Sequence, residues 1–548
     1  MLISSLRIPV TIISLLMLSM TAVYATQTTP PWNVMLITVD NLRPDHMSLY
    51  GYEKDTTPYL KKFAKESAVF NHAFSTSAWT APGMVSIFTG YYPPVHAQHG
   101  RFSFYDEEMT AAFRVLAKQG YEILGEAIDG PSHSGFGFQK RLGKWWLKEP
   151  LLESFIEERV GNETPFFAWA HLTDVHLPYT TSEKNAKRFG ATKRTSKAID
   201  AVGKYRVILR HPEQVDVKLN HPGKVNFDEK DIPIVQALYD GEVADVDERL
   251  RKNLERMRET GLLDHTIVII AADHGEELFD HGWLGHASTG YDAKLYDELI
   301  RIPMIIHLPD QSLTGTFSAM VQGVDVMPTL FDLLGINATS MNPQMQGHSF
   351  LPIMKGDKNK IRDYVFNQTS LKGWTTPKEE MASRIVSVRS KDKKLIWIPT
   401  KEGTRIEAYD LQQDPNERTN LYPTKRGEFR SLEKARDEWI ADNQSRSAKL
   451  VQGAAKKRIE KIANAVLGEA DVTEAVKNWT AIQTMQETWG LEPDSIFQQK
   501  AYAKTWQHIQ HQAERMLGDA MLCQSKGTAV RTNNPQQPLD INSWYCDL

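Results

Sequence analysis

Asn33-Val-Met-Leu-Ile-Thr-Val-Asp40 is an apolar run that ends in a carboxylate. A run without polar alternation is typical of a strand that is buried on both faces of a parallel sheet. The stretch Thr266-Ile-Val-Ile-Ile-Ala-Ala-Asp273 repeats the pattern, and residues 165–171 and 302–307 are two further runs of this kind. Because ligands bind beyond the carboxyl ends of such strands, we expect both carboxylates at one functional edge.

Helical segments separate these strands. Residues 107–119 are predicted to form a helix that ends at Gly120, and apolar residues at helical spacing over 246–257 predict another that ends near Gly261. Strands that alternate with helices favour an α/β fold with a mostly parallel central sheet flanked by helices.

The chain of 548 residues is longer than one compact domain usually needs. We expect a signal peptide over 1–25, an α/β catalytic domain over 26–380, a smaller C-terminal sheet subdomain over 381–424 and a helical C-terminal extension over 425–548. Short strand-like pieces after residue 383 and a polar, helical texture after residue 424 suggest the last two boundaries.

The first residues are typical of a secretory signal. Arg7 precedes an apolar run over residues 8–20, and Ala25 is a small residue where cleavage would fall. The run is too short for a comfortable membrane span. We therefore expect a mature protein that begins near Thr26, is periplasmic or secreted, and has no stable membrane insertion.

The composition is that of an ordinary globular protein, and the net charge of −4 gives no reason to expect a nucleic-acid partner. Cys523 and Cys546 are the only cysteines, so one local disulfide is plausible in an exported chain. Residues 180–228 are rich in Lys and Arg and predict an inserted surface segment, which would either attract an anionic substrate or be a solvated loop.

The chemistry is expected in Ser77-Ala-Trp-Thr80-Ala-Pro82-Gly-Met-Val-Ser-Ile-Phe-Thr-Gly90. Thr80 precedes Pro82 and an apolar run, which places it near the start of a helix. Unpaired N–H groups at a helix start attract a phosphate-like or sulfate-like anion. A Thr hydroxyl is a poor nucleophile unless a metal or base activates it. The alternative is that Thr80 only caps a core helix.

Residues at the strand ends could supply the metal site. Asp40, Asn41, Asp273, His274 and the Thr80 hydroxyl make a donor set composed mostly of oxygen. Ca²⁺, Mg²⁺ or Mn²⁺ suit such a set, and Zn²⁺ is not excluded.

Two loops carry further candidates. The segment from Asp273 to His286 combines a strand end with three histidines and several acids, and residues 171–179 contain His176. His176 could donate a proton to a bound anion or to a leaving group, or could simply lie at the surface.

Together these motifs resemble the sulfatase family of the alkaline-phosphatase superfamily, over residues 33–421. The matching segments are Val39-Asp40-Asn-Leu-Arg43-Pro-Asp45-His, Tyr50-Gly-Tyr, Thr56-Thr-Pro58, Thr80-Ala-Pro82 through Thr89-Gly90, His176-Leu-Pro-Tyr179, Asp273-His-Gly-Glu-Glu, Leu295-Tyr-Asp-Glu-Leu-Ile-Arg-Ile-Pro303, Val324-Asp-Val-Met-Pro-Thr329, Tyr409-Asp-Leu, Asp414-Pro-Asn-Glu417 and Asn420-Leu421.

The resemblance implies one divalent metal ion bound by Asp40, Asn41, Asp273 and His274, with Thr80 facing it. The family usually has Asp where this chain has Asn41. His176 resembles the family's substrate-binding His. His286 falls where related phosphonate monoester hydrolases carry a Lys that contacts the transferred group, and the nearby Lys294 could serve instead. His176, His286 and Lys294 are therefore the substrate-binding candidates. The catalytic candidates are Thr80, His176 and His286.

One departure from the family concerns the nucleophile. Sulfatases have Cys or Ser followed by x-Pro-x-Arg, and that residue is oxidised to formylglycine. Here Thr80 and Met84 occupy the two positions, so no formylglycine is expected. Superfamily members with Thr at this position attack phosphorus. We therefore expect an exported metal-dependent hydrolase or transferase for phosphate or phosphonate esters. The alternatives are a sulfuric-ester hydrolase that uses unmodified Thr80 and a non-catalytic anion-binding protein.

Overall fold

The computed structural model describes residues 31–98, 111–125, 152–177, 179–191, 229–286, 293–337, 345–373 and 383–447. Outside the described residues lie the predicted signal peptide, residues 192–228 of the basic segment 180–228, the tail beyond residue 447, and both cysteines, Cys523 and Cys546.

The central sheet has the strand order β10-β2-β9-β5-β1-β4-β3, with the short β8 paired to β2. β1 runs parallel to its neighbours β4 and β5, and the pairs β3–β4 and β2–β10 are also parallel. The predicted α/β fold with a mostly parallel sheet is therefore confirmed. The strands are β1 (Asn33–Val39), β2 (Ala68–Phe74), β3 (Glu122–Gly125), β4 (Phe166–Leu172), β5 (Thr266–Ala272), β8 (Arg301–Ile302), β9 (Met304–His307) and β10 (Gly315–Gln322).

The run over residues 302–307 differs from the expectation. It forms the end of β8 and all of β9, which are separated at Pro303, and β9 is antiparallel to both β2 and β5. Proline has no N–H to donate to a sheet, which explains the interruption. An apolar run shows that a strand is buried but not which way it runs, so the prediction of a parallel strand here is wrong.

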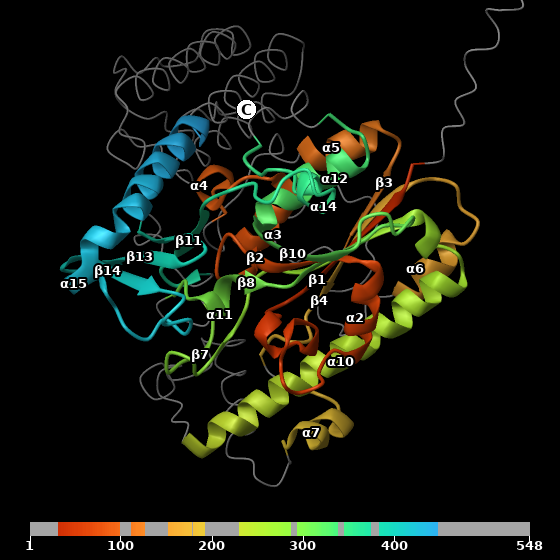
Figure 1. Cartoon of the computed structure of the whole chain (residues 1–548). Helices are drawn as coiled ribbons and strands as arrows, with labels where there is room; N and C mark the ends of the chain where they lie inside the picture. The colour runs from red at the N-terminus through yellow and green to blue at the C-terminus, as the bar shows by residue number, and fades with distance from the viewer. Residues whose placement is uncertain are drawn as a thin grey trace, which may run out of the picture.

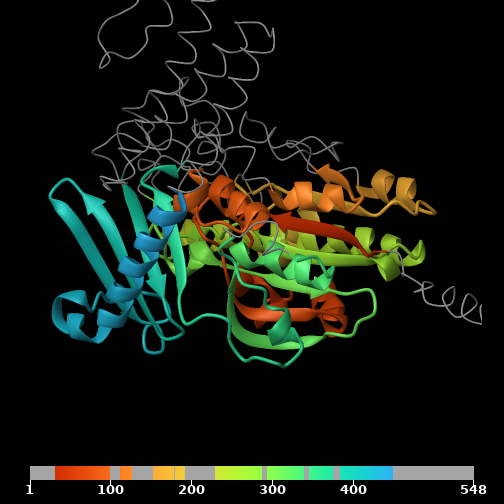
Figure 2. The ribbon, with the colours of Figure 1, turned by 90° about the horizontal axis from the view of Figure 1, so that it is seen from above.

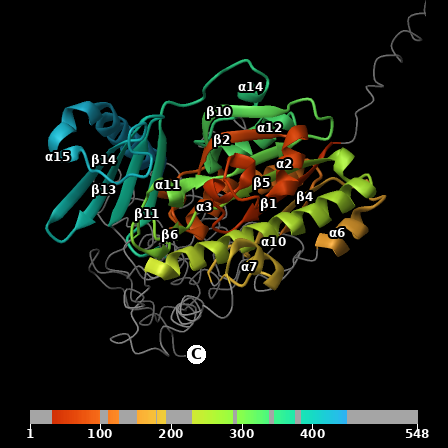
Figure 3. The same ribbon diagram turned by 60° about the horizontal axis from the view of Figure 1, so that its bottom comes forward.

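Helices cover both faces of the sheet, which is why β4 and β5 are buried along their whole length. Figure 1 shows α3, α5 and α12 above the strands, and α10 with α2, α6 and α7 below them; Figure 3 shows α10 crossing the second face. The α-helices are α2 (Pro58–Phe63), α3 (Thr80–Thr89), α4 (Pro93–His96), α5 (Ala111–Lys118), α6 (Leu152–Arg159), α7 (Glu183–Phe189), α10 (Ile232–Glu259), α11 (Asp297–Ile300), α12 (Val326–Leu333), α14 (Leu351–Met354) and α15 (Tyr422–Lys425).

The two predicted helices are present. α5 is followed by Gly120, with φ of +86°, and α10 by Gly261, with φ of +75°, both in the left-handed conformation that glycine tolerates after a helix. The expected start of the first helix, residues 107–110, lies outside the described residues, and α10 begins well before residue 246. None of the described helices is both long and apolar enough to cross a bilayer.

A second sheet stands at one end of the central one, as Figure 2 shows. It is antiparallel with the order β11-β12-β13-β14, and a helix over residues 430–447 packs on it through Trp439, whose ring stacks on Phe366 at 5.2 Å. The strands are β11 (Val365–Ser370), β12 (Arg384–Arg389), β13 (Lys393–Thr400) and β14 (Gly403–Asp410). The sheet thus begins ahead of residue 381, where the sequence predicts the subdomain to start.

Buried ion pairs hold this second sheet to the central domain. The fully buried Lys394 on β13 lies 2.9 Å from Asp297 Oδ1 at the start of α11 and 2.8 Å from Glu417 Oε1. Arg389 on β12 also pairs with Asp297, at 3.1 Å. Because buried charges are costly unless they are paired, these ion pairs fix how the two sheets meet. The hairpin of β6 (Glu277–Leu278) and β7 (Leu284–Gly285) lies next to them, since His281 between its strands contacts the carbonyl oxygen of Glu417.

Candidate active site

The strand register brings the two predicted carboxylates together. Val39, the last residue of β1, pairs with Ala272, the last residue of β5, so Asp40 and Asp273 leave adjacent strands at the same level. β4 lies on the other side of β1, with His171 opposite Thr38. All three strand ends therefore open at one edge of the sheet, as expected for parallel strands.

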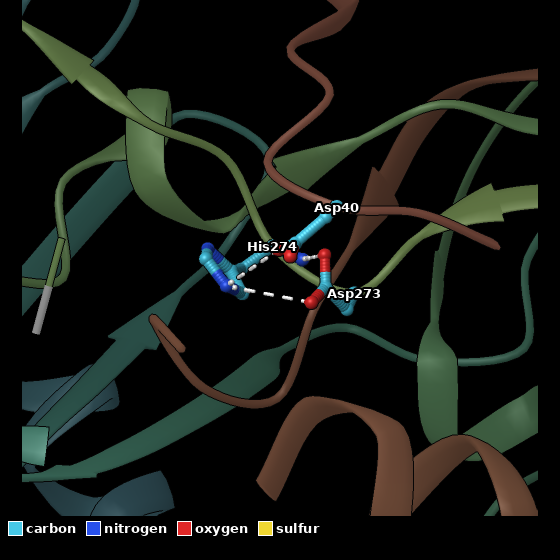
Figure 4. A group of neighbouring side chains, drawn as sticks. All are labelled: Asp40, Asp273 and His274. Atoms are coloured by element: carbon cyan, nitrogen blue, oxygen red, sulfur yellow. Dashed lines mark hydrogen bonds and ion pairs between the residues drawn. The ribbon is translucent and has the colours of Figure 1, made fainter. Parts of the chain in front are cut away.

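His274 has its ring orientation and tautomer set by the backbone. Its Nδ1 donates to the carbonyl oxygen of Gly275 at 2.7 Å, so the proton is on Nδ1 and Nε2 carries a lone pair. Nε2 lies 3.7 Å from Asp40 Oδ1 and 3.4 Å from Asp273 Oδ2 (Figure 4). Three acceptor atoms thus face one another, and a cation between them would relieve the repulsion.

Buried oxygen atoms that lack donors support the same conclusion. Asp40 Oδ1, Asn41 Oδ1 and Asp273 Oδ2 accept no hydrogen bond from any residue that the structure describes, although all three side chains are buried. The ligating atoms of Asp40, Asp273 and His274 lie within 4.8 Å of one another. Since an unsatisfied buried acceptor costs about 1–3 kcal/mol, and these are oxygen and imidazole donors, the residues fit a divalent ion.

Thr80 is the first residue of α3, as predicted, and its Oγ1 lies 3.3 Å from His274 Nε2. The residue in the capping position is Trp79, and the helix start has no side-chain cap, so the alternative that Thr80 caps the helix is wrong. Gly83 lets α3 approach this closely, because a Cβ there would lie 2.5 Å from the carbonyl oxygen of Asp273.

Asn41 adopts the left-handed conformation, with φ of +62°, and is completely buried. Its N–H donates to Asp273 Oδ1 at 3.2 Å, and its carbonyl oxygen accepts from the hydroxyl of Tyr239 at 2.7 Å. Asn tolerates this conformation better than most residues do. The backbone of Asn41 is therefore clamped between β5 and α10, with its side chain beside the carboxylates.

Glu276 is a site residue that the sequence reasoning missed. It is completely buried, and its carboxylate accepts from Asn41 Nδ2 at 2.5 Å, from His286 Nδ1 at 2.9 Å and from the Tyr179 hydroxyl at 3.3 Å. Burial raises the pKa of Glu276 to about 7, against the opposing effect of nearby His176. The available signal was its place two residues after His274 in a loop already rich in acids.

The histidines predicted to bind substrate gather around the same point. The ring centroid of His286 lies 4.6 Å from that of His274 and 5.0 Å from that of His176. The loop that carries His176 is held by Asp174, which is buried and pairs with Arg249 on α10. The arrangement puts nitrogen donors beside the candidate ion site and the Thr80 hydroxyl.

The charge states follow from the surroundings. Burial alone would raise the pKa of Asp40, but the imidazoles of His176, His171 and His274 outweigh it and hold that pKa well below its usual range. Burial raises the pKa of Asp273 to about 6, with a further contribution from the charge of Asp40. Burial also lowers the pKa of His274, which keeps its imidazole neutral as a metal ligand must be.

The structure does not bring Lys294 into this group. Its Nζ lies 3.3 Å from Glu277 Oε2 and over the ring of Trp283 at 5.0 Å, and within the described residues no contact joins it to the residues around His274. His281 belongs to the same neighbouring cluster: its Nδ1 lies 2.6 Å from Glu298 Oε1. Burial lowers the pKa of His281, but its hydrogen bond to Glu298 and that carboxylate's charge outweigh burial and raise it.

Comparisons with known proteins agree with this geometry. A family model described as Sulfatase matches residues 32–336, more than half of the chain. A second, described as N-sulphoglucosamine sulphohydrolase, C-terminal, matches residues 281–444, which include the small sheet.

Individual relatives are distant. The chain is 25% identical over 345 residues to an ulvan-active sulfatase of Formosa agariphila, covering 58% of this chain and 53% of that protein, so it spans about half of that relative's length. It is 27% identical over 455 residues to an arylsulfatase of Clostridium perfringens, covering 71% of this chain and 90% of that protein. The solved structure of a phosphonate monoester hydrolase of Agrobacterium radiobacter aligns with a TM-score of 0.59 at 19% identity, over 76% of this chain and 96% of that one, which is a likeness of fold.

Proposed function

This chain belongs to the sulfatase family, and we propose that it is an exported, metal-dependent hydrolase or transferase that acts on phosphate or phosphonate esters through the unmodified hydroxyl of Thr80. Membership of the family makes it an ester hydrolase of the sulfatase superfamily. The ester class, the metal and the nucleophile are the parts that we propose.

The observation that carries the proposal is the position of one hydroxyl. Thr80 Oγ1 lies 3.3 Å from His274 Nε2, the nitrogen that also faces Asp40 and Asp273. A divalent ion held there by Asp40, Asn41, Asp273 and His274 would lower the pKa of the Thr80 hydroxyl and polarise an oxygen of the substrate. The start of α3, which no side chain caps, supports anion binding there.

The chain's own residues then account for both halves of the reaction. Thr80 Oγ loses its proton to water and attacks phosphorus in line, forming a new O–P bond while the bond to the leaving group breaks. We assign charge stabilisation and protonation of the leaving oxygen to His176 and His286. Water or an acceptor alcohol then attacks phosphorus, and Thr80 Oγ departs and regains a proton.

A second candidate, hydrolysis of sulfuric esters by the same hydroxyl, is favoured by the names of the relatives. The Formosa agariphila protein is an ulvan-active sulfatase and the Clostridium perfringens protein an arylsulfatase. A sulfuryl group presents a similar tetrahedral anion to the start of α3 and to the histidines. The third expectation, an anion-binding protein without activity, has no observation in its favour.

The test compares an aryl sulfate, a phosphate monoester, a phosphodiester and a phosphonate ester as substrates, each with Ca²⁺, Mg²⁺, Mn²⁺ and Zn²⁺. We expect Thr80→Ala to lower turnover of the phosphodiester or phosphonate about a thousandfold or more while metal binding persists. Thr80→Ser, which keeps a hydroxyl, is the matched control and should retain measurable activity. Full activity of Thr80→Ala would remove Thr80 from the mechanism, and turnover of the aryl sulfate alone would favour the second candidate. N-terminal sequencing of exported protein should begin near Thr26.

A further inference from the structure

The loop after β5 carries a buried carboxylate that no step of the proposed reaction uses. Gly275 N–H donates to the carbonyl of Leu299 at 2.9 Å, and Glu276 N–H donates to the carbonyl of Glu298 at 3.1 Å. A Cβ at Gly275 would lie 2.0 Å from the carbonyl oxygen of Glu298, so only glycine permits this approach. The backbone therefore holds Glu276 in one place, beneath the candidate ion site.

Glu276 touches two of the predicted site residues at once. One carboxylate oxygen, Oε2, lies 2.5 Å from Asn41 Nδ2, and the other, Oε1, lies 2.9 Å from His286 Nδ1. Tyr179 adds its hydroxyl to Oε2 at 3.3 Å. The side chains of Glu276 and Asn41 are both completely buried, so these contacts are not exchanged with bulk water.

We propose that Glu276 is a positioning residue that decides which atoms Asn41 and His286 present to the ion and the substrate, and this inference rests on the function proposed above. A carboxylate only accepts hydrogen bonds, so the Asn41 amide must turn its NH₂ group toward Glu276. The amide oxygen of Asn41, which accepts no hydrogen bond from a described residue, is then the atom available as a ligand.

The same logic applies to the imidazole. His286 Nδ1 lies 2.9 Å from Glu276 Oε1, an acceptor, and 3.2 Å from Asn41 Nδ2, a donor. The nearer partner is the carboxylate and the Asn41 NH₂ group already donates to Glu276 Oε2, so we assign a proton to Nδ1 that is donated to Oε1. The Nε2 of this ring is then the nitrogen that gains or loses a proton when His286 acts on a substrate. Glu276 thus orients one metal ligand and one substrate-binding residue through a single buried group, as carboxylates behind metal sites commonly do.

The test is Glu276→Gln in the purified full chain at about pH 8, where Glu276 of the wild type is a carboxylate. The glutamine amide keeps its shape but must offer an NH₂ group to one of its two partners. Its oxygen stays with the Asn41 NH₂ group, the shorter contact, so the NH₂ group faces His286 Nδ1 and forces the proton of that ring onto Nε2. Because a neutral amide oxygen holds the Asn41 NH₂ group less firmly than a carboxylate does, we expect the dissociation constant for Mn²⁺, measured by calorimetry, to rise about 10- to 100-fold. In Ca²⁺-loaded protein, the ¹⁵N resonances of His286, assigned against His286→Gln, should show the proton moving from Nδ1 to Nε2.

Two further variants make the result decisive. Glu277→Gln removes the neighbouring buried charge, which contacts Lys294 rather than Asn41, and should change neither the Mn²⁺ affinity nor the His286 resonances. The double variant Asn41→Asp with Glu276→Gln exchanges donor and acceptor, so the NH₂ group at position 276 turns to the new carboxylate and its oxygen again accepts from His286 Nδ1. We expect it to restore the Nδ1 proton and Mn²⁺ binding.

The proposal is overturned if Glu276→Gln leaves both the Mn²⁺ affinity and the His286 proton unchanged, or if Glu277→Gln has the same effects. Should Glu276→Gln fail to fold, folding of the double variant supports the proposal, and its failure to fold overturns it. None of these measurements uses turnover, so they are separable from the ester panel, which alone decides whether Thr80 is the nucleophile.

Discussion

Removal of the divalent ion should destabilise the fold, because it leaves two buried carboxylates facing each other. The ligating oxygens of Asp40 and Asp273 lie within 4.8 Å of each other, and both residues are buried. Two unit charges at that distance repel by about 3.5 kcal/mol at an effective dielectric constant of about 20. An ion present at about 1,000 times its dissociation constant contributes about 4 kcal/mol, which is the same size.

The measurement is thermal unfolding at pH 8 with and without a chelator. For a cooperative unit of roughly 400 residues, about 4 kcal/mol corresponds to a drop in Tm of about 5 °C. Restoring Mn²⁺ or Ca²⁺ should reverse the drop.

The matched control is Asp273→Asn. An amide oxygen in place of Oδ1 can still accept from the N–H groups of Asn41 and His274, at 3.2 and 2.9 Å, while the repulsion with Asp40 disappears. We expect its Tm without metal to equal or exceed that of the wild type without metal, and to be insensitive to the chelator. The wild-type protein is loaded in turn with each of the four ions and then treated with the chelator. If its Tm stays constant in every case, the reasoning is refuted, because the two carboxylates would then need no cation.

Three other predictions concern the surroundings of the site. Lys394→Met should destabilise the protein by about 3–5 kcal/mol in chemical denaturation, since it leaves the buried Glu417 without a cation and Asp297 with Arg389 alone. Lys393→Met, which removes an exposed pair, should cost less than about 1 kcal/mol. Gly275→Ala should lower the free energy of unfolding by at least about 1–3 kcal/mol and weaken Mn²⁺ binding, because the new Cβ would overlap a backbone carbonyl. Its control is Gly427→Ala, where the Cβ enters open space and the free energy of unfolding should change by less than about 0.5 kcal/mol. The raised pKa of His281 contributes stability that is full below about pH 6.5 and is lost as pH rises through the raised value. His281→Gln should therefore flatten the decline of Tm above about pH 6.5.

The parts of the site that lie at strand ends could be predicted from the sequence, because parallel strands leave the sheet at a common edge. Asp40 and Asp273 each follow an uninterrupted apolar run, and the register of β1 with β5 puts them side by side. Thr80 was found because a proline and an apolar run follow it, and it is the first residue of α3. The inference for the two carboxylates needed only the burial of each strand and the residue that ends it, and the inference for Thr80 needed only the residues that follow it.

Other features depend on pairings that no local pattern encodes. The reversed direction of β9 follows from its insertion between β2 and β5, and an apolar run reads the same in either direction. Glu276 gains its role from Asn41, 235 residues earlier in the chain, and Lys294 loses the expected one because Glu277 holds it. In both cases the partner, and not the residue type, determines what the side chain can do.

The site is also where the chain departs most from what folding alone would favour. Asn41 has a positive φ, and three buried oxygens accept no hydrogen bond from the described residues. Together these features cost on the order of 5–10 kcal/mol, which is comparable with the whole stability of an ordinary domain. Hydrogen bonds from Tyr239 and to Asp273 hold the backbone of Asn41 without any contribution from an ion. The donor atoms are therefore arranged before a cation binds, so binding offsets the desolvation of the carboxylates and needs little rearrangement of the chain.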